Sequence, residues 1–218
     1  MPRDKVTFKL GGYTPLSACS RWPFIIVGLT GSIGMGKSTT SNLLEVMNVP
    51  VFDSDRVIHS LLLGKGKTLQ KVAERFPTVV FDGIIDRKKL GSIVFHDSLA
   101  RRDLENFLYP MLLLEREKFF RFHSLNRSRL VVLDAPLLYE KRLDALCDYI
   151  LVMTAPSFVQ SQRVLARVGM SVDKYHAILK SQMPDSTKRF LASKVIFSGV
   201  GRHTTWRCLV KTLSDLRK

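Results

Sequence analysis

The chain has 218 residues, of which 45% are hydrophobic and 24% are charged, as is typical of a globular protein with one sizeable core. Its three cysteines are widely scattered, which argues against a disulfide framework or a zinc site, and no apolar run is long enough to span a membrane. Together these features favour a cytoplasmic protein without a membrane segment.

The chain is strongly basic, because it has 34 Lys and Arg residues but only 19 Asp and Glu residues, which gives a net charge of +15. Such a charge can serve nucleic-acid binding or the attraction of polyanionic nucleotides. The basic residues spread from Arg3 to Lys218, and no basic motif interleaved with aromatic residues is present. We therefore favour the second interpretation and expect no nucleic-acid partner.

The first elements lead into a glycine-rich segment. Residues 1–23 contain no continuous apolar stretch, so we expect a poorly ordered extension rather than a signal peptide. The apolar run over 24–30 predicts a buried parallel strand, and residues 39–47 predict a helix. A short strand is expected over 49–52, followed by an acidic turn at 53–55.

The stretch over about 56–123 is predicted to be helical. Apolar residues at helical spacing predict helices over 56–63, 68–76, 87–95 and 98–123, with a turn at Asp82-Gly83 and a candidate break at Pro110. We interpret this stretch as an inserted helical subdomain that binds substrate over the carboxyl ends of the strands, where open α/β sheets bind ligands.

The remaining sequence alternates between strands and helices. Strands are expected over 130–134, 149–153 and 195–197, and helices over 157–168, 172–182 and 204–216. This alternation predicts an α/β fold with a doubly wound parallel sheet over 24–218. Residues 157–182 would form a helical lid.

The most informative motif is Gly-Ser-Ile-Gly-Met-Gly-Lys-Ser at 31–38, which matches G-x-x-x-x-G-K-[ST] between a strand and a helix. Backbone N–H groups of such a loop converge on an anion, and the helix N-terminus adds positive charge. Lys37 is expected to reach the β- and γ-phosphates, and Ser38 to ligate Mg²⁺. The predicted nucleotide-phosphate site comprises Gly31, Ser32, Ile33, Gly34, Met35, Gly36, Lys37, Ser38 and Thr39.

Three carboxylates follow predicted strands. Asp53 and Asp55 would lie near a γ-phosphate, where a carboxylate can accept the proton of an attacking hydroxyl. Asp55 is the preferred base, and capping of the helix that begins at Arg56 is the alternative role for Asp53. Asp134 occupies a Walker-B-like position, from which a carboxylate reaches Mg²⁺ through water; a turn cap is its alternative role.

Arg163 and Arg167 are one helical turn apart and share a helix face. Guanidinium groups can stabilise charge on a transferring phosphoryl group, and with Gln160 these two could close a mobile lid over the nucleotide. Spacing alone favours a solvated basic face instead, so the lid interpretation depends on further information.

The order of these motifs resembles the dephospho-CoA kinase family over residues 26–199. The resemblance rests on segments spread along the chain, namely 28–39, 51–55 with His59, 82–90, 94–95, 104–105, 109–110, 136–140, Gln160, Arg163, Arg167 and 182–183. This combination is far more specific than the phosphate-loop motif alone.

The resemblance implies a P-loop kinase fold and phosphorylation of the 3′-hydroxyl of the dephospho-CoA ribose, with ATP and Mg²⁺. It implies that Asp55 is the base and that Lys37 and Arg163 are catalytic. It also implies that Arg163 and Arg167 hold the ATP phosphates. The implied substrate-site residues are Asp53, Asp55, Arg87 and Leu138, and the implied metal-site residues are Ser38 and Asp134.

Several positions depart from the family pattern. Ser32 and Met35 stand at variable positions of the phosphate loop. The other departures replace His, Arg, Asp and Asn of the family with Tyr109, Leu113, Ser193 and Ser198 respectively. At these four positions the sequence leaves open which groups would make the family's contacts with the substrate and with adenine.

Two other functional classes are considered. A kinase for nucleoside monophosphates or sugars would share the phosphate loop, but the motif at 136–140 and the long helical insert argue against it. A nucleic-acid-dependent ATPase or a GTPase would suit the basic charge, yet the sequence lacks the N-K-x-D motif of GTPases. We expect the small molecule dephospho-CoA as partner and leave a homo-oligomer open.

Overall fold

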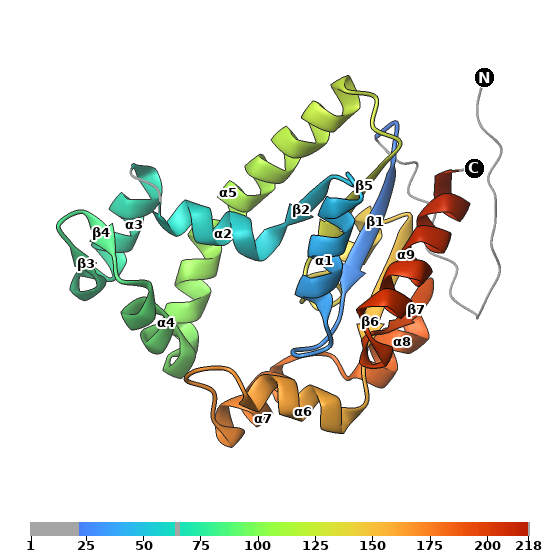
Figure 1. The fold of residues 1–218 in the computed structure, drawn as a ribbon. Coiled ribbons are helices and arrows are strands. Elements are labelled where there is room, and N and C mark those ends of the chain that lie inside the picture. Colours follow the sequence, from blue (N-terminus) through green and yellow to red (C-terminus); the bar gives the residue numbers. More distant parts are fainter. Residues whose placement is uncertain (1–21, 64–65, 218) are drawn as a thin grey trace. The chain divides into compact units, whose positions relative to one another are not determined.

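The computed structural model describes residues 22–63 and 66–217. The predicted N-terminal extension therefore lies outside the described residues, apart from its last two positions. The chain divides into two compact units (Figure 1). One unit contains the chain up to Val51 and from His123 onward, and the other is Phe52–Phe122. None of the helices in the described ranges is long and apolar enough to cross a membrane.

A five-stranded sheet organises the first unit, with the strand order β2-β5-β1-β6-β7. The central strand β1 (Ile25–Thr30) pairs in parallel with β5 (Leu130–Asp134) and with β6 (Tyr149–Thr154). Strand β7 (Lys194–Phe197) pairs in parallel with β6, and β2 (Val51–Asp53) lies next to β5. Because β5 and β6 flank β1 on opposite sides, the sheet is doubly wound around the strand that leads into the phosphate loop.

The described part of the first unit has five α-helices: α1 (Lys37–Val46), α6 (Ser157–Leu165), α7 (Val172–Ser181), α8 (Asp185–Leu191) and α9 (Arg202–Arg217). Short 3₁₀ helices occupy Leu143–Leu146 and Ser198–Val200. Helices α1 and α9 pack side by side (Figure 1). The core between helices and sheet is apolar because the central strands are apolar almost throughout, and it includes Val27, Leu29, Met35, Leu44, Val132, Leu151, Met153, Ile196 and Leu209.

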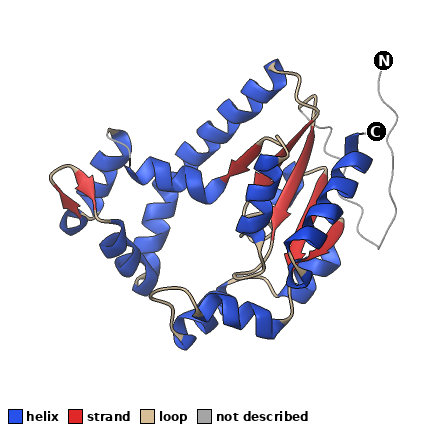
Figure 2. Ribbon diagram, viewed as in Figure 1, coloured by secondary structure: helices blue, strands red, loops and turns tan. Residues whose placement is uncertain are grey.

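The second unit is mainly helical, with a small hairpin among its helices (Figure 2). Its elements are α2 (Ser54–Leu63), α3 (Lys67–Arg75), a 3₁₀ turn at Pro77–Val79, β3 (Val80–Phe81), β4 (Ile84–Ile85), α4 (Arg87–His96) and most of α5 (Ser98–Leu125). It has its own apolar core, which includes Val72, Phe76, Val79, Ile85, Leu90, Ala100, Leu104 and Leu108.

Three local features differ from the sequence-based expectation. The hairpin β3–β4 interrupts the helices, and its turn residues Asp82 and Gly83 have φ of 49° and 73°, which suit the Asp-Gly type I′ turn. Pro110 does not divide α5, which stays one helix of 28 residues. The expected acidic turn is absent because Asp53 ends β2 and α2 begins directly at Ser54.

Candidate active site

The phosphate loop lies between the end of β1 and the start of α1, so it projects from the central strand of the sheet. Gly34 and Gly36 have φ of 77° and 87°, in the left-handed region. A Cβ at Gly34 would lie 2.6 Å from Val164, and one at Gly36 would lie 2.7 Å from the Ser198 hydroxyl. Glycine is thus required at both positions, for backbone conformation and for space.

Helix α1 begins at Lys37, with Gly36 as its N-cap. The cap makes no side-chain hydrogen bond, so within the described structure the first N–H groups of α1 are not satisfied by a capping side chain. Ser38 and Thr39 are exposed in this first turn. The start of α1 therefore has the geometry of an anion-binding helix N-terminus, as the motif predicts.

Lys37 and Asp134 are brought together by the sheet. Asp134 ends β5, where it pairs in register with Leu29 of β1, and it is 1% exposed. The Lys37 Nζ donates a hydrogen bond of 2.9 Å to Asp134 Oδ1. This charge-assisted contact holds the lysine head beside the loop.

The oxygen donors at this site suit a magnesium ion. The Ser38 hydroxyl and the Asp134 carboxylate are hard oxygen ligands, which Mg²⁺ prefers together with water and substrate phosphates. No group of three or more His, Cys, Asp or Glu side chains in the described ranges could hold a metal ion by itself. A magnesium site built from these two residues would thus depend on nucleotide oxygens.

Both backbone polar groups of Ile33, in the middle of the loop, are held by glutamine side chains. The Ile33 N–H donates to Gln182 Oε1 at 3.0 Å, and the Gln160 Nε2 donates to the Ile33 carbonyl at 2.8 Å. The Tyr175 hydroxyl donates to Gln160 Oε1 at 3.2 Å. The predicted lid segment thus supports the loop through side chains on α6, on α7 and just after α7.

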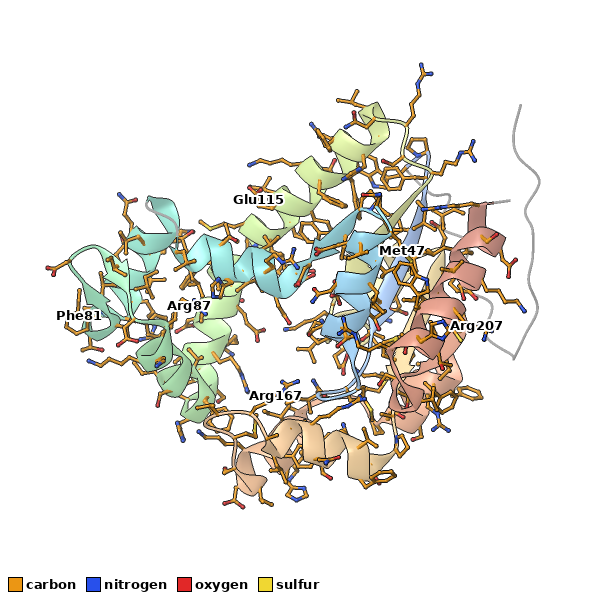
Figure 3. All side chains as sticks on the ribbon, in the orientation of Figure 1. Met47, Phe81, Arg87, Glu115, Arg167 and Arg207 are labelled. Carbon is orange, nitrogen blue, oxygen red and sulfur yellow. The ribbon has the colours of Figure 1, made fainter. Side chains whose placement is uncertain are left out.

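Arg163 is half-buried and contacts the loop. Its Nη1 donates to the Ser198 hydroxyl at 2.9 Å and to the Gly34 carbonyl at 3.4 Å, and its Nη2 donates to the Ser198 carbonyl at 3.0 Å. The Ser198 hydroxyl donates in turn to the Met35 carbonyl at 2.8 Å. Arg167 is exposed just beyond the end of α6 (Figure 3), so the two arginines occupy different environments.

Residues that depart from the family pattern make specific contacts. The Met35 sulfur accepts a hydrogen bond from the Ala155 N–H at 3.1 Å, and this side chain is buried. The Ser193 hydroxyl accepts from the Ile150 N–H at 3.0 Å. With the contacts of Ser198, these bonds show that the substituted side chains are integrated into the fold.

The two aspartates at the start of the second unit have different local environments. One Asp53 oxygen accepts from the Arg56 N–H at 3.0 Å, so Asp53 caps α2, which was its alternative role. Asp55 lies exposed in the first turn of α2. An exposed carboxylate in the first turn also interacts favourably with the helix dipole.

The two remaining predicted substrate residues differ in exposure. Arg87 is exposed at the first position of α4 (Figure 3), and Asp86 caps this helix. Leu138 is completely buried, and a Cβ on Gly28 would lie 2.7 Å from its Cδ1. Leu138 therefore serves the core, and a direct ligand contact would require this side chain to leave it.

The sequence by itself assigns no role to four residues that the structure connects to the loop. The family pattern alone points to Gln182, Glu140 and Ser198, and nothing in the sequence points to Lys188. Lys188 lies on the unpredicted helix α8 and is completely buried. Nothing in its neighbouring residues, Thr187 and Arg189, distinguishes it from a surface lysine, so only the fold could identify it.

Comparisons with known proteins agree with these features. A model of the dephospho-CoA kinase family matches residues 25–200. A dephospho-CoA kinase of Paramagnetospirillum magneticum is 46% identical over 164 residues, which cover 75% of this chain and 77% of the relative. Another from Mesorhizobium japonicum is 44% identical over 177 residues, 81% of this chain and 89% of the relative.

Among solved structures, the crystal structure of TT1252 from Thermus thermophilus is 33% identical with a TM-score of 0.73, covering 88% of this chain and 98% of that chain. A dephospho-CoA kinase from Campylobacter jejuni shares the fold, with a TM-score of 0.61 at 22% identity over 88% of this chain and 96% of that chain. On the extent of the family match and the identity of these relatives, the chain belongs to the dephospho-CoA kinase family.

Proposed function

We propose that the protein transfers the γ-phosphoryl group of ATP to the 3′-hydroxyl of the dephospho-CoA ribose, which yields ADP and coenzyme A. Family membership supports the substrate pair. The observation in the structure that carries the proposal is the phosphate loop, with two left-handed glycines, an uncapped helix N-terminus and a lysine held beside it.

The loop and α1 bind the ATP phosphates in this proposal. Backbone N–H groups over 31–39 converge on the β- and γ-phosphates, apart from those of Ile33 and Met35, which already donate to Gln182 Oε1 and to the Ser32 carbonyl. The Lys37 Nζ lies 2.9 Å from Asp134 and exchanges this partner for phosphate oxygens when ATP binds. Its positive charge then stabilises the negative charge that spreads over the γ-phosphoryl group in the transition state.

Ser38 and Asp134 hold Mg²⁺ in this proposal, the first through its hydroxyl and the second through water. When bound, the ion would neutralise negative charge on the nucleotide phosphates. The Asp134 oxygen that Lys37 releases would then be available to the ion. The two residues thus act together on the same phosphates.

Asp55 is the proposed general base. As the ribose 3′-oxygen forms its bond to the γ-phosphorus, the bond from phosphorus to the ADP oxygen breaks and the hydroxyl proton passes to the Asp55 carboxylate. Asp53 fixes the start of α2, which carries Asp55, by accepting from the Arg56 N–H. Asp53 and Arg87 are proposed to contact the acceptor, with the exposed Arg87 guanidinium suited to an anionic group.

Arg163 and Arg167 are proposed to stabilise the transferring phosphoryl group. Arg163 already donates to the Gly34 carbonyl and lies at the loop, while the exposed Arg167 is free to approach the nucleotide from the segment after α6. Two guanidinium groups, one hydrogen-bonded at the loop and one exposed, suit a lid that closes over bound ATP.

The expected setting is the cytoplasm, without a nucleic-acid partner. Cys147 and Cys208 are free thiols in the described structure, which suits a reducing compartment. The excess positive charge is proposed to attract nucleotides rather than to bind a polynucleotide. An oligomeric enzyme is compatible with this proposal.

An ADP-release assay with dephospho-CoA and a panel of nucleoside monophosphates and sugars tests the proposal. We expect turnover with dephospho-CoA alone and a product that carries phosphate at the ribose 3′-position. Dephospho-CoA should also raise the melting temperature, whereas duplex DNA at physiological salt should not. DNA-stimulated ATP hydrolysis with no response to dephospho-CoA would support the nucleic-acid alternative instead.

A further inference from the structure

Lys188 is a completely buried lysine for which the proposed reaction provides no role. Its Nζ donates to the Pro136 carbonyl at 2.9 Å and lies 3.0 Å from Glu140 Oε1. Burial of a charge is unfavourable unless the charge is well paired, and a buried ion pair generally stabilises a fold no more than apolar side chains of the same size. Stability alone is therefore a poor explanation for this pair.

Glu140 links Lys188 to the segment after α7. The same oxygen, Glu140 Oε1, accepts a hydrogen bond of 2.7 Å from the Met183 N–H. The other oxygen, Oε2, is buried and has no hydrogen-bond partner within the described residues. The interactions of Glu140 thus converge on one atom, which is shared by the lysine and the Met183 backbone.

The backbone position that Glu140 fixes lies next to Gln182, whose side chain accepts from the Ile33 N–H in the phosphate loop at 3.0 Å. A second connection runs from Lys188 through the Pro136 carbonyl, which also accepts from the Thr30 hydroxyl at 3.1 Å. Thr30 ends β1 and leads directly into the loop. One connection from Lys188 therefore ends in the loop at Ile33, and the other ends at Thr30, the residue before the loop.

We propose that Lys188 and Glu140 are positioning residues for ATP binding. The pair, in which Lys188 is buried and Glu140 is 19% exposed, fixes the backbone at 182–183. Gln182 then holds Ile33, and the other N–H groups of the loop stay directed at the phosphates. Neither residue touches ATP in this account. The inference rests on the proposed function only in that ATP binds at the loop.

Two variants test this connection from opposite ends. Glu140→Leu removes the carboxylate that accepts from Met183, and Gln182→Met removes the acceptor for Ile33 while leaving the buried pair intact. In each variant we expect the Kd for ATP, measured by calorimetry well below the melting temperature, to rise about tenfold. The kcat at saturating ATP should change less, because the loop binds ground state and transition state alike.

Asp148 offers a matched control. Its carboxylate accepts from the Ile26 N–H at 2.8 Å, much as Glu140 accepts from Met183, but at the start of β1 rather than beside the loop. Asp148→Leu should lower the melting temperature and leave the Kd for ATP unchanged. A similar loss of ATP affinity in this control would show a general effect of instability and overturn the inference.

The double variant Glu140→Leu/Lys188→Met separates positioning from stability. Because it removes the lone buried charge, it should melt at a higher temperature than Glu140→Leu alone. Its ATP affinity should stay low, since the Met183 N–H still lacks its carboxylate acceptor. Recovery of ATP affinity together with the melting temperature, or an unchanged Kd in Gln182→Met, would overturn the inference. A wild-type protein that does not bind ATP would instead overturn the proposed function.

Discussion

The Lys37 ammonium lies 2.9 Å from the Asp134 carboxylate, so the sheet itself sets the position of the lysine at the end of the phosphate loop. Asp134 ends a strand buried along its whole length and is in register with Leu29, two residues before the loop begins at Gly31. Two residues 97 positions apart in the sequence thereby share one site. In the mechanism that we propose, Lys37 first leaves Asp134 for the nucleotide phosphates, and Asp134 becomes available to the metal ion.

Replacement of Lys37 by Met should lower the turnover number by about a hundredfold or more, because it removes a preorganised charge directed at the γ-phosphoryl group. The measurement is steady-state ADP release at saturating ATP and dephospho-CoA. Lys118→Met is the matched control, since Lys118 forms an exposed ion pair of 2.7 Å with Glu115 on α5 and should affect neither rate nor stability appreciably. Near-normal turnover in Lys37→Met would exclude the phosphate-loop mechanism.

Asp55→Asn should lower the turnover number by about 10²- to 10⁴-fold with little change in the Kd for ATP, because the amide keeps the shape of the side chain but cannot accept the hydroxyl proton. Single-turnover kinetics and calorimetry measure the two quantities separately. Asp97→Asn is a suitable control, because Asp97 accepts from the Leu99 and Ala100 N–H groups as a helix cap and Asn caps equally well. If ATP affinity fell while turnover at saturation held, Asp55 would be a binding residue.

Ser198→Ala should weaken ATP binding severalfold, since the hydroxyl both accepts from Arg163 and donates to the Met35 carbonyl in the loop. The stability lost should be about 1 kcal/mol, the usual contribution of a hydrogen bond. Ser193→Ala is the paired control, because this hydroxyl accepts from Ile150 near the start of β6 and not from the loop. Equal loss of ATP affinity in both variants would contradict a specific role for Ser198.

The sequence predicts the strands of the first unit well because they are continuous apolar runs in a sheet covered on both faces. It also predicts that Lys37 and Asp134 act at one site, since the carboxyl ends of parallel strands meet at one edge. The partners of Arg163 were not predictable. Helical spacing predicts that Arg163 and Arg167 share a face, although α6 ends at Leu165, before Arg167. Spacing gives no sign that Ser198, 35 residues further on, accepts from Arg163.

The helix α8 and its buried lysine were missed for a related reason. Residues 185–191 read as polar and charged, with the apolar residues too few to give a helical pattern. Lys188 is buried because of Glu140, 48 positions earlier, and the Pro136 carbonyl. Such a long-range ion pair leaves no local signal. Pro110 is a different case, because its local signal indicates a break, whereas α5 continues through it at the loss of one backbone hydrogen bond.

The stability of the first unit should depend on the protonation of Asp148. Burial raises the pKa of this carboxyl above its usual value of 3.8, although the hydrogen bond from the Ile26 N–H acts in the opposite direction. The folded protein therefore binds this proton more tightly than the unfolded chain. The stability that protonated Asp148 contributes is fully present below the pKa of this carboxyl in the unfolded chain. It is lost as the pH rises through the pKa of Asp148 in the folded protein.

Asp148→Asn removes this titration while keeping an oxygen that can accept from Ile26. The melting temperature of the variant, relative to that of the wild-type protein, should increase as the pH rises from about 3.5 to 7, because only the wild type must bury a charged carboxylate at the higher pH. Thermal denaturation followed by circular dichroism across this range measures the difference. A difference that does not vary with pH would mean that Asp148 titrates alike in the folded and unfolded chains, and a decrease would mean that its charged form is the one the fold stabilises.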